Sequence, residues 1–175
     1  MRTIQLSVSD SQKKQPKEID GKQNLLMPRF KNAHSHSAMT FLRSYADDMK
    51  LNEWLHTRVF PAEAKLTGED VYWLTKLAIL EYLTSGITSI FDMYMYRKDG
   101  ARAAIDTGFR NVFCESINDF GGTVEEVEED YLTYNKDKSK LISYQLGFHA
   151  EYTTSREKME GIAALSKKYA APVYV

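Results

Sequence analysis

The stretch TGEDVYWLTKLAILEYLTSGITSIFD, residues 67–92, decides the predicted fold because it contains a complete helix and the strand that follows it. Residues 67–70 form a capping box, in which a hydroxyl and a carboxylate satisfy free amides at a helix start. Apolar residues then recur at helical spacing as far as Tyr82, and Gly86 is a typical helix stop. Residues 87–91, which are rich in β-branched and aromatic residues, predict a strand that ends at Asp92. The stretch therefore predicts a helix followed directly by a strand, the repeating unit of α/β proteins.

The same alternation continues on both sides of this stretch. Further strands are predicted over 24–34, 111–114 and 141–148 and from residue 172. One further helix ends at Gly108, one begins with a second capping box at Thr123, and one is capped by Ser155. A long excursion, residues 37–65, carries helical patches at 50–59. Alternating strands and helices predict right-handed βαβ units in a parallel sheet.

Two α/β architectures accommodate five parallel strands. The first is a complete open, doubly wound sheet, which a length of 175 residues favours. The second is the first five β/α units of a TIM-type (β/α)₈ barrel, which typically needs about 250 residues and which the motifs below favour. Residues 24–175 are predicted to form this partial barrel, and residues 1–23 a separate N-terminal extension.

The composition is that of a folded protein without an obvious macromolecular ligand. Hydrophobic residues make up 43% of the chain and the net charge is −1, so there is no electrostatic reason to expect nucleic acid or an anionic membrane as partner. No apolar run approaches the roughly 20 residues that span a bilayer. The single cysteine, Cys114, cannot close an intrachain disulfide and fits a reducing compartment. A cytoplasmic location is expected.

Polar side chains at strand ends are the candidate functional residues. His34 and His36 are two positions apart at the end of the first strand, so both imidazoles share one face and could bind one divalent metal ion. The alternative is that two polar loop residues happen to be histidines. His149 follows the fourth strand and could bind a metal or a substrate, or simply form a hydrogen bond there. Asp92 ends the second strand and is expected to order a neighbouring loop.

Several motifs resemble one known family. MPRFKNAHSH (27–36), MTFLR (39–43), LNEWL (51–55), PAEAKLT (61–67), FDMY (91–94) and GFHAEYTTS (147–155) are similar to motifs of the metal-dependent amidohydrolases. The branch is the cytosine-deaminase-like and chlorohydrolase-like group, which includes deaminases of S-adenosylhomocysteine and methylthioadenosine. The resemblance covers about residues 24–175.

The resemblance implies a fold, a reaction and site residues. The family fold is a (β/α)₈ barrel with a small β-sandwich, of which residues 1–23 would be a short remnant. His34 and His36 correspond to the first two metal ligands, with zinc as the expected ion and iron as the alternative. Glu63 corresponds to a glutamate that binds ribose hydroxyls, Trp54 lines the same pocket, and His149 corresponds to a substrate-binding histidine. The implied reaction is hydrolytic deamination or dechlorination of an aminated heterocycle by a metal-activated water.

The chain also departs from the family pattern. Glu115 stands where nucleoside deaminases often place an arginine, which argues against a nucleoside substrate. The family's third ligand, a histidine after the fifth strand, and its proton-handling residues have no counterpart up to Val175. We therefore expect weak metal binding, no hydrolysis by the 175-residue chain alone, and self-association through open sheet edges. The alternatives are a non-catalytic α/β binding or assembly module, or a structural zinc site completed by His149 or Asp92.

Overall fold

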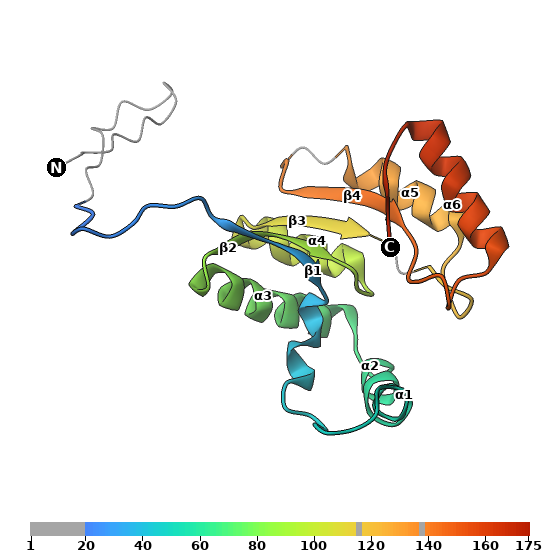
Figure 1. Ribbon diagram of the computed structural model, residues 1–175, viewed down its shortest axis with the longest axis horizontal. Helices are drawn as coiled ribbons and strands as arrows, with labels where there is room; N and C mark the ends of the chain where they lie inside the picture. The colour runs from blue at the N-terminus through green and yellow to red at the C-terminus, as the bar shows by residue number, and fades with distance from the viewer. Residues whose placement is uncertain (1–19, 115–116, 137–138) are drawn as a thin grey trace.

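The computed structural model describes residues 20–114, 117–136 and 139–175. Its centre is a five-stranded parallel sheet in the order β1-β2-β3-β4-β5 (Figure 1). The strands are β1 (Phe30–Ser35), β2 (Ile87–Asp92), β3 (Arg110–Cys114), β4 (Ile142–Gly147) and β5 (Val173–Tyr174). The helices that connect successive strands are α3 (Gly68–Thr84), α4 (Arg97–Thr107), α5 (Val124–Tyr134) and α6 (Arg156–Tyr169).

The strand order distinguishes the two predicted architectures. A doubly wound sheet reverses its strand order at a switch point, so that helices cover both faces. Here every strand pairs with the next one in sequence, and right-handed crossovers then place all the connecting helices on one face. Figure 1 shows α3 and α4 together on one side of the curled strands. The sheet therefore corresponds to the first five β/α units of a (β/α)₈ barrel, as predicted. The alternative of an open doubly wound sheet is wrong.

The sheet curls far enough for its two outer strands to make contact. The ring of Tyr174 in β5 stacks on Phe91 in β2, with 4.1 Å between ring centroids. The Tyr174 hydroxyl donates a hydrogen bond of 2.7 Å to the carbonyl of Ala33 in β1. Gly147 in β4 allows Tyr174 of β5 to lie this close, because a Cβ atom at position 147 would lie 2.5 Å from the Tyr174 carbonyl oxygen. The short strand β5 therefore contacts β1 and β2 in addition to its ladder with β4.

Local signals in the sequence set most helix boundaries correctly. Both predicted capping boxes form, at Thr67 before α3 and at Thr123 before α5. Gly86 and Gly108 follow α3 and α4 with φ of 77° and 71°, a conformation that costs a residue with a side chain about 1–2 kcal/mol. Ser155 does precede α6, but its hydroxyl makes no capping bond there.

Two boundaries differ from the prediction. The first strand begins at Phe30, later than predicted. The Phe30 backbone N–H donates to the Gly86 carbonyl. Residues 24–29 lie exposed outside the ladder, where Pro28 has no N–H to contribute. The excursion after β1 begins with η1 (Ser37–Leu42), and its helical part is longer than predicted. That part runs through α1 (Leu51–Trp54), the π-turn η2 (Leu55–Val59) and α2 (Phe60–Glu63).

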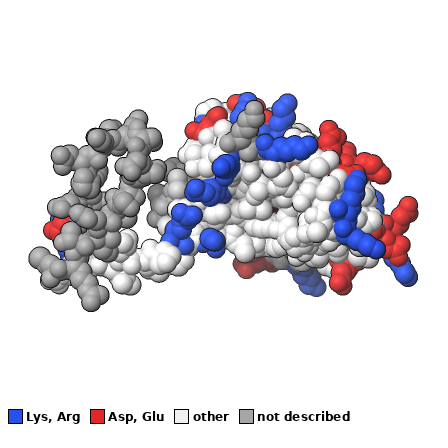
Figure 2. All heavy atoms as spheres, turned by 90° about the horizontal axis from the view of Figure 1, so that it is seen from above, with Lys and Arg blue, Asp and Glu red and all other residues white. Residues whose placement is uncertain are grey.

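The core lies between the sheet and the connecting helices. Its fully buried side chains come from every layer and include Ile79, Ile90, Phe113, Val127, Leu146 and Ile162. The thiol of Cys114 is buried in this core. Over the described ranges no helix is long and apolar enough to cross a membrane. Figure 2 shows both signs of charge on the visible face of the described residues, with uncharged side chains over its middle. Residues 1–19 lie outside the description, so the proposed division at residue 23 stays a prediction.

Candidate metal and substrate site

The candidate site lies where the carboxyl ends of β1 and β2 meet. Ser35, the last residue of β1, is paired in register with Asp92, the last residue of β2. The pairing continues one step further, because the Met93 backbone N–H donates to the Ser35 carbonyl at 3.0 Å. The two predicted metal ligands, His34 and His36, flank Ser35 on this strand end. Carboxyl ends of parallel strands are where (β/α) barrels place their active sites.

The imidazole of His36 is held in one orientation by the neighbouring strand. Its Nδ1 atom lies 2.7 Å from the Met93 carbonyl oxygen. A carbonyl oxygen can only accept, so Nδ1 carries the proton and Nε2 keeps its lone pair. Metal-binding histidines are typically fixed in this way, by a second ring nitrogen that donates to a carbonyl or carboxylate. Nε2 is therefore the ring nitrogen of His36 that could bind a metal ion.

The spacing of the two histidines fits a shared ion. The ring centroids of His34 and His36 are 5.0 Å apart and the rings are nearly perpendicular. Two imidazoles on one tetrahedral zinc ion, with Zn–N distances of 2.0–2.1 Å, also have centroids about 5 Å apart. Within the described residues, however, no group of three or more histidine, cysteine, aspartate or glutamate side chains could hold a metal ion. The described part of the chain thus offers two of the donors that a zinc site needs.

Asp92 acts on the loop that carries His36, as expected. Its side chain is 2% exposed, and Oδ1 accepts a hydrogen bond of 2.9 Å from the Ser37 backbone N–H. The other oxygen lies 3.4 Å from Nδ2 of Asn111 in β3. Burial raises the pKa of Asp92 above its ordinary value, and these hydrogen bonds oppose that rise. Asp92 does not join the two histidines in a three-donor group.

Glu63 approaches the same strand ends from the excursion. It is the last residue of α2 and is half-buried, and its Oε1 accepts a hydrogen bond of 2.8 Å from the Tyr94 hydroxyl. Burial raises the pKa of Glu63, while the Tyr94 hydrogen bond and the nearby imidazole of His36 lower it. Burial and the Glu63 carboxylate together raise the pKa of Tyr94 above its usual range, so this hydroxyl remains the donor.

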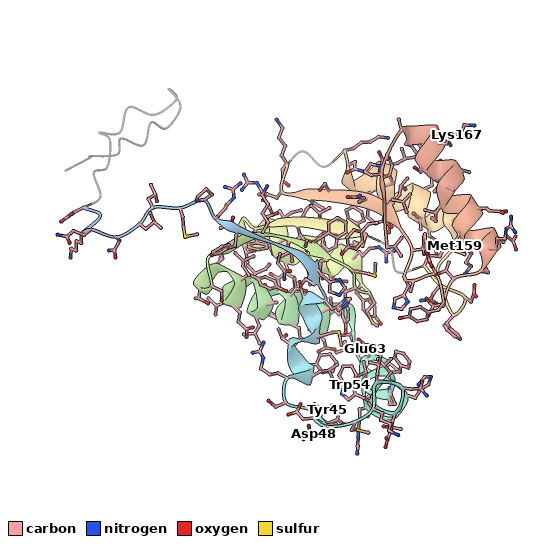
Figure 3. All side chains as sticks on the ribbon, in the orientation of Figure 1. Tyr45, Asp48, Trp54, Glu63, Met159 and Lys167 are labelled. Atoms are coloured by element: carbon pink, nitrogen blue, oxygen red, sulfur yellow. The ribbon has the colours of Figure 1, made fainter. Side chains whose placement is uncertain are left out.

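An open cavity of about 470 Å³ lies against the end of β1. Its lining includes His34, His36 and Trp54, three of the five predicted site residues. Trp54 is anchored by its indole N–H, which donates to the Tyr45 carbonyl at 3.3 Å. Figure 3 shows Tyr45, Trp54 and Glu63 together on the excursion, below the strand ends in that view. The structure thus brings the imidazole pair and the predicted pocket tryptophan to one cavity.

His149 is placed differently from the other predicted site residues. It follows β4, is exposed, and does not line the cavity. Its Nδ1 lies 2.7 Å from the Thr153 hydroxyl, and its backbone N–H donates to the Ile117 carbonyl. These contacts fix the loop after β4 at the same end of the sheet as His34. A substrate-binding role for His149 therefore stays a prediction. Glu115 lies outside the described residues.

Sequence reasoning gave no role to two groups that the structure places at the centre of this site. The Met93 carbonyl orients His36, and the Tyr94 hydroxyl holds Glu63. Both belong to the FDMY motif, which carried the family resemblance but suggested no contact. Contacts between groups that are 31 or more positions apart in the chain leave no spacing pattern in a single sequence.

Comparison with known proteins gives the family. The model of the amidohydrolase family matches residues 25–175, which is most of the chain. The chain belongs to the amidohydrolase family. This amidohydrolase is 38% identical over 165 residues to a 5-methylthioadenosine/S-adenosylhomocysteine deaminase of Symbiobacterium thermophilum, covering 91% of the chain and 38% of the relative. It is 42% identical over 156 residues to a 5'-deoxyadenosine deaminase of Methanospirillum hungatei, covering 86% of the chain and 35% of the relative.

A solved structure supports the same assignment of the fold. The amidohydrolase superposes on an adenosine deaminase from Xanthomonas campestris, solved with bound zinc, with a TM-score of 0.74 and 31% identity. The match covers 84% of this chain and 35% of that protein. The chain therefore spans less than two fifths of the length of these relatives. The predicted resemblance to the deaminase branch of the amidohydrolases is confirmed.

Proposed function

We propose that this chain supplies the first metal ligands and part of the substrate pocket of an enzyme that hydrolytically deaminates an aminated purine. The observation that carries the proposal is the His34–His36 pair at the carboxyl end of β1, with His36 oriented by the Met93 carbonyl. The pair opens onto the cavity that Trp54 lines. The relatives named above are deaminases of adenine nucleosides, which supports a substrate of that class.

The residues of this chain would divide the work between metal and substrate. His34 and His36 would hold a divalent ion, zinc in the first instance, and the chemistry that such an ion would supply is activation of a water for attack at the ring carbon that bears the amine. Met93 keeps the proton of His36 on Nδ1, so that Nε2 stays available as a ligand. Trp54 offers a flat apolar surface at the cavity, and Glu63 accepts hydrogen bonds from sugar hydroxyls. In the net reaction a C–O bond replaces the C–N bond and the amine leaves as ammonia.

The two imidazoles alone do not complete a tetrahedral site, which needs further donors. The expectation that the 175-residue chain alone binds metal weakly and turns nothing over stays a prediction. The test of function therefore uses the full-length protein that carries this chain.

The experiment measures zinc content and ammonia release together. Full-length protein is loaded with zinc and assayed with 5'-methylthioadenosine, S-adenosylhomocysteine and 5'-deoxyadenosine. We expect zinc-dependent ammonia release, and loss of both stoichiometric zinc and turnover in His36→Ala. His56→Ala is the matched control, because His56 is an exposed histidine whose described contacts, with the Asn52 carbonyl and the Phe60 ring, lie one helical turn away on its own helical stretch. The proposal fails if His36→Ala keeps its zinc and its rate, or if no aminated purine releases ammonia. Chloride release from a chlorinated triazine would instead favour dechlorination.

A further inference from the structure

The three residues that follow Phe91 fasten several parts of the site to the end of β2. Asp92 accepts from the Ser37 backbone N–H, and the Met93 carbonyl accepts from His36. The next residue, Tyr94, reaches the excursion and donates to Glu63. One short segment therefore sets the position of the histidine turn and of the Glu63 carboxylate at the same time.

The Glu63 carboxylate stands at the end of a helical stretch. The elements α1, η2 and α2 follow one another without a gap, and Glu63 is the last residue of this stretch. Two tyrosines of the loop after β2 anchor this region: Tyr94 through Glu63, and Tyr96 through the Leu66 carbonyl at 2.9 Å. Tyr96 holds only the backbone, whereas Tyr94 holds the carboxylate itself. The orientation of the Glu63 carboxylate therefore depends on Tyr94.

The chemistry of this pair defines what it can recognise. An ionised carboxylate only accepts hydrogen bonds, and the Tyr94 hydroxyl already occupies Oε1. Among the described hydrogen bonds none uses Oε2, so this atom can accept from a ligand, and the hydrogen bond to Oε1 limits rotation of the group. Glu63 does not itself line the cavity beside Trp54, so a sugar that reaches it must extend beyond that cavity. A neutral group with hydroxyl donors, such as the cis-diol of a ribose, matches this arrangement. An acceptor held in place before binding gives higher affinity, because less side-chain freedom is lost when the ligand arrives.

We propose that Tyr94 is a positioning residue that fixes Glu63 for a sugar diol and so determines the preference of the site for nucleosides over ligands that lack the diol. The inference deepens the proposed function and rests on its assignment of Glu63 to sugar hydroxyls. Tyr94 itself acts through Glu63. The expected signature is a loss that depends on the ligand's hydroxyl groups and not on its base.

The experiment compares ligand preference in two tyrosine variants of the full-length, zinc-loaded protein. Binding of inosine and of 2',3'-dideoxyinosine is measured by calorimetry, so that no turnover is required. Wild type is expected to prefer inosine, and Tyr94→Phe to weaken inosine binding about tenfold, the equivalent of one hydrogen bond to a charged group. Binding of the dideoxy ligand should not change. Tyr96→Phe, which removes a hydroxyl from the same loop, should keep the wild-type preference.

Two outcomes would overturn the inference. In the first, Tyr94→Phe weakens both ligands equally, which indicates general disruption of the pocket. In the second, it weakens neither, which means that Glu63 needs no support. Adenosine turnover by wild type is scored separately. If wild type releases no ammonia from adenosine but its preference for the diol depends on Tyr94, deamination is rejected and the role of Tyr94 stands. With active protein, Tyr94→Phe should raise KM for adenosine and leave kcat nearly unchanged.

Discussion

Replacing Gly147 with alanine should detach β5 from the rest of the sheet. The added Cβ would lie 2.5 Å from the Tyr174 carbonyl oxygen, and ordinary contact requires that oxygen to move back by about 1 Å. The atom that must move belongs to backbone, so a side-chain rotation cannot relieve the contact. The ladder between β4 and β5 contains only the pairs Leu146–Val173 and Gly147–Tyr174, so few other hydrogen bonds resist the shift.

The cost follows from the interactions that depend on the position of Tyr174. Its carbonyl accepts from the Phe148 N–H, its hydroxyl donates to the Ala33 carbonyl, and its ring stacks on Phe91. Each of these contributes about 1 kcal/mol. Gly147→Ala should therefore lower the free energy of unfolding by about 3 kcal/mol. In a domain of this size such a change lowers Tm by about 6–12 °C.

The assay is urea unfolding followed by far-ultraviolet circular dichroism, with near-ultraviolet dichroism as a second probe of the Phe91–Tyr174 stack. Tyr174→Phe should lose only the hydrogen bond to Ala33, about 1 kcal/mol. Gly121→Ala is the control, because a Cβ there meets no atom within 4 Å, and its effect should stay within about 0.5 kcal/mol. If Gly147→Ala is as stable as Gly121→Ala, the argument that Gly147 admits β5 is refuted.

Two further predictions concern pH and assembly. Burial raises the folded-state pKa of Glu63, so its stabilising contribution is present below the unfolded pKa of about 4.3 and is lost as pH rises through the folded value. Wild type should therefore lose stability relative to Glu63→Gln between pH 4 and pH 7 in urea titrations, and parallel profiles would contradict this. The isolated 175-residue chain should self-associate, because among the described strands β1 is paired with β2 alone, and Trp73, Leu77 and Leu80 are exposed on α3. A sharp monomer in sedimentation velocity that binds no hydrophobic dye would argue against it.

The sequence predicted best the features that depend on neighbouring residues. The capping boxes at Thr67 and Thr123 and the stops at Gly86 and Gly108 are local, and each formed where predicted. Ser155 was predicted to cap α6, but its hydroxyl makes no capping bond. The Ser155 backbone N–H donates to Asp119, a long-range contact that nothing within a few residues of Ser155 indicates.

The candidate site was predictable in its parts but not in its connections. His34 and His36 could be placed on one face because strand geometry has a period of two. The contacts that orient the site, from Met93 to His36 and from Tyr94 to Glu63, depend on the register of β1 against β2 and on the path of the excursion. Both are tertiary properties, and the alternating pattern of a single sequence does not contain them.

The consecutive strand order also has a kinetic consequence. Each β/α unit pairs with the unit made just before it, so the chain can add structure step by step as it leaves the ribosome. After the long excursion between β1 and β2, each later step closes a single helical crossover. The bond from Tyr174 to Ala33 is different, because it joins residues 141 positions apart. It closes the longest loop and can form only after every strand between them is in place. Folding of this sheet should therefore begin at β1 and finish when Tyr174 returns to it.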